Sequence, residues 1–259
     1  MHLHPCLSCI FLSLAAVTQQ NVLAADAAAA IRISPQPSAP DDAKSVEQGF
    51  VGFGIEMKSF PQYAGSSFYL TTSNDNDAGK GIEHANEFSK NLLSTFTSKT
   101  GAPVHIRIGG TSMDNSKFDP TQTNQATKNT TDSSKNRLHT KITIGAPWIE
   151  SFKHWDNVLY TLQVPLARKN LSNAIEFARA CIDAMPNHVQ DLEAIEIGNE
   201  PNLYPRIDRN DSYGPVNYAR EWDRFAGAIV GNISRLNGKE WFQAMTFSSE
   251  VDPNGPWTV

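Results

Sequence analysis

The sequence predicts an α/β protein, built as an incomplete (β/α)8 TIM barrel with about strands 1–5 of the eight that close such a barrel. Short apolar segments alternate with longer ones in which apolar residues recur at helical spacing, the pattern of parallel βαβ units. Polar residues gather where these strands end, the face on which barrels build their sites. No Gly-x-Gly-x-x-Gly motif follows the first strand, which disfavours a dinucleotide-binding, doubly wound sheet.

The first part of the chain divides into a leader and a linker. Residues 1–24 resemble a signal peptide, because residues 6–17 are apolar but too short to span a bilayer and small residues precede Ala25. The absence of Lys and Arg ahead of the apolar run leaves a disordered leader as the alternative. Residues 25–48 are expected to form an N-terminal strand at 31–34 and a Pro-rich linker.

Residues 49–259 are predicted to form the partial barrel. Its strands are expected at residues 50–56, 104–108, 158–164, 194–198 and 242–247, with a weaker strand at 141–145. Helices are expected at residues 88–99, 174–185 and 218–236, and residues 111–138 read as a long polar loop. Because an arc of about five strands leaves an open edge, which natural folds avoid, we expect this sequence to be the N-terminal part of a longer enzyme that also has the rest of the barrel.

Charge, hydropathy and sequence motifs limit the classes of partner that the sequence predicts and indicate where the protein is located. A net charge of −5 disfavours nucleic acid, and no later segment is apolar enough to predict a membrane helix, so no membrane association is expected after signal cleavage. With the leader, four N-x-S/T sequons indicate secretion; their asparagines are Asn129, Asn170, Asn210 and Asn232.

Cysteine and histidine usage predicts neither disulfides nor a metal. Cys6 and Cys9 would leave with the leader, so Cys181 would stand alone inside a helical pattern and is expected to be a buried helix residue rather than a catalytic thiol. The histidines show no metal-ligand spacing, and no cofactor or metal is expected.

The most specific chemical signal is Glu200. An apolar run ends at Gly198, and Asn199-Glu200-Pro201 follows, with Pro201 unable to donate to a strand ladder. A carboxylic acid at the mouth of a barrel strand is suited to protonate the leaving oxygen in glycoside hydrolysis. The alternative is an ordinary turn, which Asn and Pro also favour.

At this point the sequence resembles glycoside hydrolase family 79, the β-glucuronidase and heparanase-like family. Six motifs carry the resemblance in order along the chain: Gly-Phe-Gly-Ile-Glu at 52–56, Phe-Ser-Lys-Asn-Leu at 88–92, His-Ile-Arg-Ile-Gly-Gly-Thr at 105–111, Phe-Asp-Pro at 118–120, Ile-Thr-Ile-Gly at 142–145 and Glu-Ile-Gly-Asn-Glu-Pro at 196–201.

The resemblance implies a retaining mechanism with Glu200 as general acid/base and a nucleophilic Glu at the end of barrel strand seven, which this sequence does not reach. It also implies a C-terminal β-sandwich, likewise absent from the sequence, and a glycan substrate with β-linked glucuronic acid. The substrate-binding residues that it implies are Glu56, Arg107, Gly110, Thr111 and Asn199. Arg107 has two interpretations: it donates a hydrogen bond to the nucleophile, or it forms a buried ion pair inside the barrel. Glu250 is interpreted as a rim residue.

Three readings of the function stay open. The protein is a β-glucuronidase-type hydrolase, a truncated and inactive fragment or carbohydrate-binding relic, or a barrel glycosidase for neutral β-glycans. No protein partner is inferred. Four aromatic residues have two interpretations, as a platform that stacks on sugar rings or as a small core under a loop: Trp148, Phe152, Trp155 and Tyr160.

Overall fold

The structure, a computed structural model, describes residues 38, 42–65, 71–72, 84–128, 141–205, 207–237, 240–244 and 257. The chain divides into two units, Met1–Ser45 and Val46–Val259. The described residues of the first unit, residue 38 and residues 42–45, are all exposed. The strand predicted at 31–34 lies outside the described residues. All that follows concerns the second unit.

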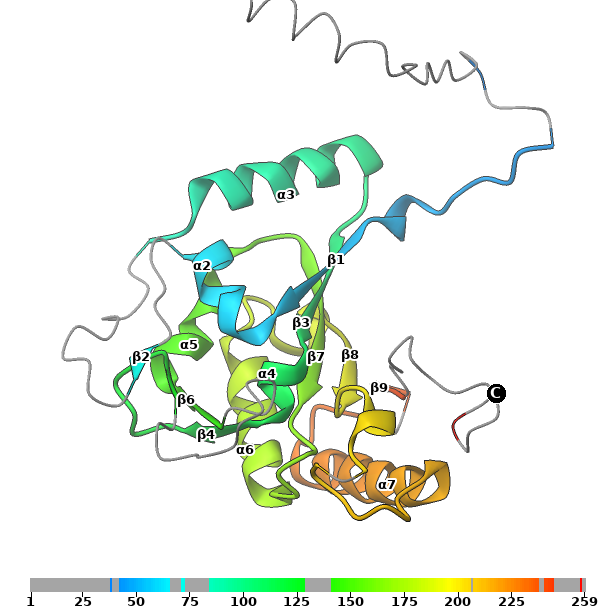
Figure 1. The fold of residues 1–259 in the computed structure, drawn as a ribbon. Helices are drawn as coiled ribbons and strands as arrows, with labels where there is room; N and C mark the ends of the chain where they lie inside the picture. The colour runs from blue at the N-terminus through cyan, green and yellow to red at the C-terminus, as the bar shows by residue number, and fades with distance from the viewer. Residues whose placement is uncertain are drawn as a thin grey trace, which may run out of the picture. The chain divides into compact units, whose positions relative to one another are not determined.

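A five-stranded sheet forms the centre of this unit (Figure 1). Its strands are β1 (Gly52–Glu56), β3 (Val104–Gly109), β7 (Val158–Val164), β8 (Leu192–Ile197) and β9 (Phe242–Gln243). Every neighbouring pair is parallel, and the order β1-β3-β7-β8-β9 follows the order along the chain. The sheet therefore lacks the reversal of strand order that defines a doubly wound fold. The prediction of an α/β fold with a parallel sheet is confirmed.

The two faces of the sheet differ in polarity because side chains alternate along each strand. Ile106, Leu162 and Ile195 are almost completely buried on the face that the helices cover. The opposite face carries polar side chains, of which Arg107 and Glu196 contact each other across β7. The sheet thus places its polar residues together, along what would be the interior of a barrel.

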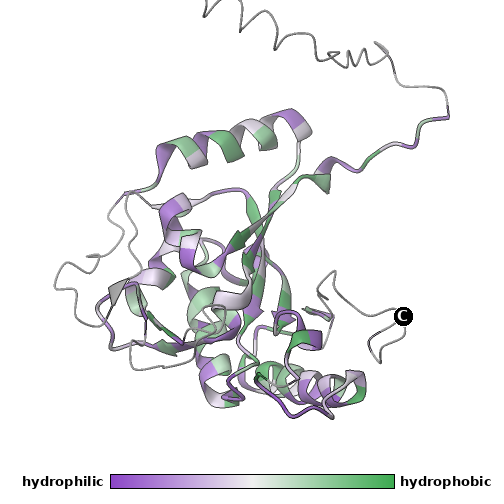
Figure 2. Ribbon diagram, in the orientation of Figure 1, coloured by the Kyte–Doolittle hydropathy of each residue, from purple (hydrophilic) through white to green (hydrophobic). Residues whose placement is uncertain are grey.

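Three long helices cover the apolar face, and their ends have clear local causes. The helices are α3 (Glu87–Thr100), α6 (Leu171–Ala184) and α7 (Pro215–Asn232). The side chain of Asn86 accepts a hydrogen bond from the Ser89 amide at the start of α3, and Asn170 caps α6 in the same way. Hydrophobic and hydrophilic residues alternate along α7 at helical spacing (Figure 2).

A second, smaller sheet corrects the prediction of a long polar loop at residues 111–138. It has the strand order β2 (Thr71–Thr72), β5 (Ala126–Lys128), β6 (Ile142–Gly145) and β4 (Ser116–Asp119), with β4 and β6 parallel and β5 and β6 antiparallel. A short helix, α4 (Thr111–Asp114), precedes β4. The apolar residues Phe118 and Ala126 are buried and supply the core contacts that the polar composition conceals. Residues 129–140 lie outside the described residues.

Short helices lie between the longer elements along the chain: η1 (Gln48–Phe50), η2 (Met57–Ser59), α2 (Phe60–Ala64), α5 (Ala146–Ile149), η4 (Glu150–His154), η5 (His188–Asp191) and η6 (Pro201–Leu203). Three of them, α2, α5 and η4, contribute side chains to one aromatic core. Phe60 makes edge-to-face contacts with Trp148, Phe152, Trp155 and Tyr160, and all five side chains are buried. These aromatic residues therefore belong to the core and are unavailable as a sugar-stacking platform.

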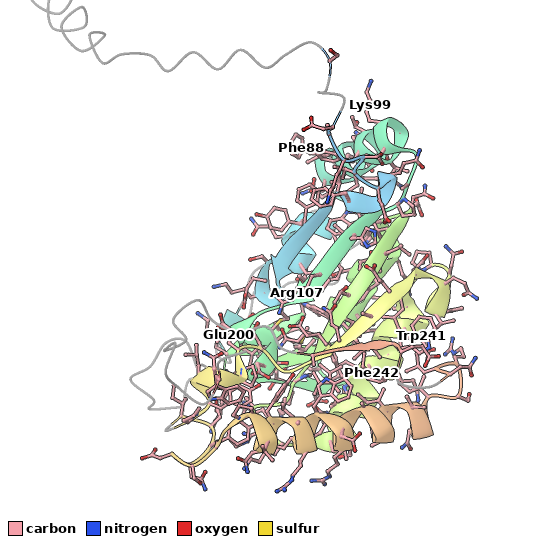
Figure 3. All side chains as sticks on the ribbon, turned by 90° about the vertical axis from the view of Figure 1, so that its right-hand side faces the viewer. Phe88, Lys99, Arg107, Glu200, Trp241 and Phe242 are labelled. Carbon is pink, nitrogen blue, oxygen red and sulfur yellow. The ribbon has the colours of Figure 1, made fainter. Side chains whose placement is uncertain are left out.

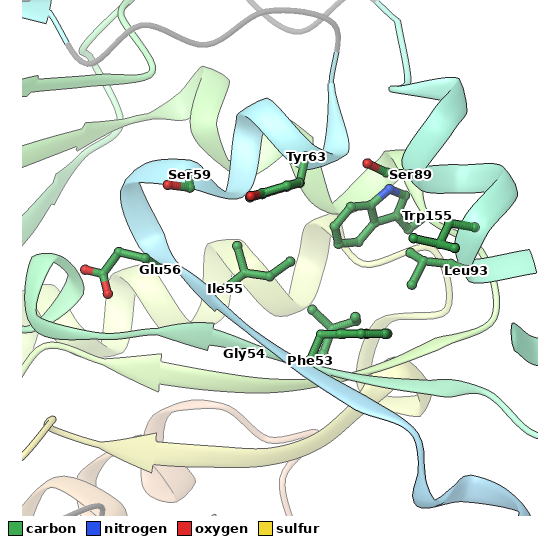
Figure 4. Close-up of a pocket in the computed structure, with 11 residues that line it drawn as sticks. Phe53, Gly54, Ile55, Glu56, Ser59, Tyr63, Ser89, Leu93 and Trp155 are labelled. Carbon is green, nitrogen blue, oxygen red and sulfur yellow. The ribbon is translucent and has the colours of Figure 1, made fainter. Parts of the chain in front are cut away.

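The edge of the sheet at β1 is open within the described residues, where β1 pairs with β3 alone. Beside it lies a cavity of about 380 Å³ between β1, α2 and α3, lined by apolar side chains such as Phe53, Leu93 and Trp155 (Figure 4).

Cys181 is buried in α6, as predicted. Among the described residues, none of the helices combines the length and the apolar character that crossing a membrane requires.

Candidate active site

The polar residues predicted to act together lie at the carboxyl end of the sheet. Glu56 ends β1, Gly110 and Thr111 follow β3, and Glu200 follows β8. Because parallel strands end at the same edge, these residues share one face of the fold. Figure 3 shows Arg107 and Glu200 toward this end, whereas Phe88 and Lys99 lie at the opposite end.

Glu200 lies on a sharply bent turn after β8. Gly198 has φ of 79°, and Glu200 itself has φ of 48° and ψ of 56°, a left-handed conformation that costs a residue with a side chain about 1–2 kcal/mol. A Cβ at residue 198 would lie 2.6 Å from the Tyr204 hydroxyl, so the turn requires glycine there. Pro201 then begins η6. Such strained backbone persists only where surrounding contacts hold it.

Arg107 forms a two-pronged ion pair with Glu196, the alternative that the sequence left open. Its Nε donates to Glu196 Oε2 at 2.6 Å and its Nη2 to Glu196 Oε1 at 2.9 Å, and Glu196 is 1% exposed. Burial by itself lowers the pKa of Arg107, but the hydrogen bonds and charge of Glu196 raise it, with further help from the charges of Glu56 and Glu200. Arg107 Nη2 also donates to Asn199 Oδ1 at 3.0 Å.

Gln163 and Glu196 are site residues that the predictions missed. Gln163 Oε1 accepts a hydrogen bond from the Gly110 amide at 2.6 Å and lies 3.4 Å from Arg107 Nη2. Both residues interrupt otherwise apolar strands at positions that alternate onto the polar face of the sheet. That interruption is the sequence signal by which they could have been found.

Glu56 is held beside the loop that follows β3. Its Oε1 accepts a hydrogen bond from the Ser112 amide at 2.8 Å. Gly110 has φ of 94°, and a Cβ there would lie 1.8 Å from Glu56 Oε2. Thr111 Oγ1 is 3.4 Å from Asn199 Nδ2, which connects this loop to the turn after β8.

A small cavity opens next to Glu200. Its volume is about 160 Å³, and its lining includes Thr111, Asn199, Glu200 and Tyr204. Glu200 is partly exposed, and its Oε2 lies 3.3 Å from Asn199 Nδ2. The structure thus brings Glu200 together with the five substrate-binding residues predicted around it, and Glu200 borders a cavity.

Other predicted residues lie elsewhere. Glu250 and the sequon asparagine Asn129 are outside the described residues, whereas Asn170, Asn210 and Asn232 are exposed. Within the described parts of the chain, no group of His, Cys, Asp and Glu side chains is arranged to hold a metal ion.

Comparison with known proteins gives partial matches. No family model matches the chain. The chain is 31% identical over 201 residues to a β-glucuronidase of Aspergillus niger, covering 73% of this chain and 34% of that protein. It is 24% identical over 202 residues to a β-glucuronidase of Neurospora crassa, covering 74% of this chain and 33% of that protein. The chain thus spans about a third of the length of the curated relatives it matches.

A solved structure has a similar fold. It is that of a 4-O-α-L-rhamnosyl-β-D-glucuronidase from Fusarium oxysporum 12S in complex with Rha-GlcA. The match has a TM-score of 0.54 and 22% identity and covers 76% of this chain and 39% of that one. At this identity the likeness establishes the fold alone. The two sequence matches confirm the resemblance to glycoside hydrolase family 79 over about a third of the relatives' length.

Proposed function

The chain is homologous to part of the fungal β-glucuronidases of glycoside hydrolase family 79, and from this premise we propose that it supplies the acid/base part of a retaining β-glucuronidase site. Glu200 is the proton donor in this proposal. The observation that carries it is the turn after β8, where Glu200 borders a cavity beside Asn199, whose side chain Arg107 holds.

The proposed chemistry has two steps. Glu200 first protonates the glycosidic oxygen as the bond to the anomeric carbon breaks and a carboxylate of the enzyme bonds to that carbon. Glu200 then takes a proton from the water that releases the sugar. Asn199, which is fixed by Arg107, has an amide beside Glu200 that can bind a sugar hydroxyl.

The second carboxylate must lie about 5–5.5 Å from the first in a retaining enzyme. Three described carboxylates near Glu200 are engaged in other contacts. Glu196 is buried and paired with Arg107, Glu56 accepts a hydrogen bond from the Ser112 amide, and Asp114 is buried and accepts hydrogen bonds from the amides of Leu166 and Asn199. We therefore propose that the nucleophile comes from outside the described residues, on further strands that complete a (β/α)8 barrel, and that Arg107 contacts it there.

Specificity for β-linked glucuronic acid is also part of the proposal. It is supported by the names of the two fungal relatives and by the Rha-GlcA ligand of the Fusarium enzyme. A site for neutral β-glycans would predict comparable hydrolysis of an aryl β-glucoside and an aryl β-glucuronide. The proposed specificity predicts a strong preference for the glucuronide.

Secretion and N-glycosylation complete the proposal. The apolar leader and the exposure of Asn170, Asn210 and Asn232 support both. N-terminal sequencing of the protein from culture medium should begin near Ala25, and an endoglycosidase should increase its electrophoretic mobility. Retention of the whole protein in cells would contradict this part.

The test of Glu200 compares leaving groups. In the longest natural form of the protein that carries these residues, Glu200→Gln should lower the hydrolysis rate of a phenyl β-glucuronide by about 10²–10⁴-fold. A dinitrophenyl glycoside needs little protonation and should lose far less in its glycosylation step. Glu193→Gln is the matched control, because Glu193 lies near the start of β8, the strand that leads to Glu200, and its side chain is 40% exposed. Equal rates for Glu200→Gln and the unmodified protein on both substrates would remove the assignment.

A further inference from the structure

We propose that Asp114 is a positioning residue that fixes the turn carrying Glu200, acting through both of its carboxylate oxygens on the loops that follow β7 and β8. The inference rests on the proposed role of Glu200 and deepens it. Asp114 ends α4, in the loop after β3, and is 2% exposed.

Each oxygen of Asp114 has two donors. Oδ1 accepts hydrogen bonds from the amides of Leu166 and Ala167, at 2.9 and 3.1 Å, in the loop after β7. Oδ2 accepts from the Asn199 amide at 3.3 Å and from the Tyr204 hydroxyl, both in the loop after β8. One carboxylate therefore joins the loops after three neighbouring strands of the sheet.

The bond to Asn199 lies at the strained part of the turn. Asn199 stands between Gly198 and Glu200, both of which have positive φ. A backbone in this conformation relaxes unless other contacts hold it. The Asp114 bond to the Asn199 amide is such a contact, and the Tyr204 hydroxyl ties the far end of the same turn to the same oxygen. Losing both bonds frees the backbone that aims the Glu200 side chain.

The donors to Asp114 also show that burying this carboxylate costs free energy. They are three backbone amides and a phenol, so no cation offsets its burial in these contacts. Burial raises the pKa of Asp114 to about 6, against the opposing effect of these hydrogen bonds. A costly polar group next to a strained turn is the pattern expected where geometry matters more than stability.

The first test is a double-mutant cycle between Asp114 and Glu200. Asp114→Asn keeps the size of the side chain and can keep Oδ1 as an acceptor, but its amide nitrogen meets two donors. We expect kcat for a phenyl β-glucuronide to fall by about 10²-fold, because small misplacements of a catalytic group cost that much, while KM changes little. Combined with Glu200→Gln, Asp114→Asn should lower the rate no further, because both changes remove the same proton transfer.

Tyrosine variants keep the inference testable if Asp114→Asn does not fold. Tyr204→Phe removes one donor to Oδ2 and should give a smaller loss with the same dependence on the leaving group. Tyr218→Phe is the control, because its buried hydroxyl donates to the Ile197 carbonyl at 3.0 Å, just before the turn. It should leave the leaving-group dependence unchanged.

The outcomes separate this inference from the proposed function. If Glu200→Gln shows the leaving-group effect but neither Asp114→Asn nor Tyr204→Phe does, Asp114 is not a positioning residue. If the loss from Asp114→Asn adds in full to that of Glu200→Gln, its effect is generally structural and the inference is again overturned. If Glu200→Gln itself shows no leaving-group effect, the proposed function fails and this inference fails with it.

Discussion

Asp114 and Arg209 bind the backbone of the same two residues, Leu166 and Ala167, one at the amides and the other at the carbonyls. Asp114 accepts hydrogen bonds from the amides of Leu166 and Ala167, while Arg209 donates to their carbonyl oxygens, Nη2 to Leu166 at 3.1 Å and Nη1 to Ala167 at 3.0 Å. Every backbone polar group of these two residues is thereby bound to a buried side chain. The loop after β7 is consequently a fixed support for the turn after β8.

Replacing Arg209 by lysine should weaken this support although the charge is kept. Arg209 also pairs with Glu221, with Nη2 to Oε2 at 2.8 Å, and an ammonium cannot reach the carboxylate and both carbonyls as the planar guanidinium does. Leaving buried carbonyls without a donor costs about 1–3 kcal/mol. We expect Arg209→Lys to lower the free energy of unfolding by about 2 kcal/mol, measured by urea titration.

Arg179→Lys is the matched control for this prediction. Arg179 is exposed and makes one hydrogen bond to a carbonyl, from Nη2 to Asn232 at 2.8 Å. Its replacement should change the stability by less than about 0.5 kcal/mol. Equal effects of the two substitutions would show that the Arg209 contacts do not stabilise the loop.

Stability should fall as the pH rises through the range in which Asp114 loses its proton. Its pKa is about 6 in the folded protein, against an ordinary value of 3.8. The folded state therefore binds the proton more tightly than the unfolded state, and the free energy of unfolding decreases between about pH 4 and pH 6 by on the order of 3 kcal/mol. Above that range this contribution is constant.

Asp114→Asn isolates this contribution because it removes the titrating group. Unfolding curves measured from pH 4 to pH 7 should show a stability difference between the variant and the unmodified protein that changes with pH over the same interval. Parallel stability curves for the two proteins would contradict the raised pKa.

Gly110→Ala should destabilise the protein at the carboxyl end of the sheet, where the candidate site lies. Residue 110 has φ of 94°, and an added Cβ would lie 1.8 Å from Glu56 Oε2. The backbone strain alone costs about 1–3 kcal/mol, because φ of 94° with ψ of −177° is a conformation that essentially only glycine adopts, and the displaced carboxylate adds to this cost. Gly54→Ala is the control, because nothing lies within 4 Å of a Cβ there. In a thermal melt, Gly110→Ala should lower Tm clearly, and Glu56→Ala in the same chain should recover part of the loss; no recovery would place the cost in the backbone alone.

The predictions succeeded where local sequence determines structure. Strand β7 lies at the predicted residues 158–164, because a short apolar segment of this length with clear ends is typical of a buried strand. The Asn199-Glu200 pair was found because the end of an apolar strand is visible in the sequence. The polar side chains predicted at the strand ends meet at one face because all strands of the sheet are parallel.

The predictions failed where structure depends on distant contacts. Strand β5 has three residues, Ala126–Lys128, and forms only through pairing with β6 and β2. Asp114 lies in the same polar stretch, and its donors come from residues between 52 and 90 positions further along the chain. A single sequence gives no sign of such partners, so Asp114, which joins three loops of the site, resembled an ordinary loop aspartate.

Breaking the ion pair between Arg107 and Glu196 should cost more than breaking a surface pair. Glu196 is 1% exposed and Arg107 is 29% exposed. Removing the carboxylate therefore leaves a largely buried, positively charged guanidinium without the negative charge that pairs with it. Loss of one partner from a fully buried pair costs about 3–5 kcal/mol, and the partial exposure of Arg107 puts Glu196→Gln near the lower end of that range. The pair of Lys90 and Asp156, at 3.5 Å with both side chains exposed, is the comparison, and Lys90→Met should cost no more than about 1 kcal/mol. Urea titrations of both variants decide the matter, and similar losses would show that the buried pair of Arg107 and Glu196 contributes no more to stability than an exposed one.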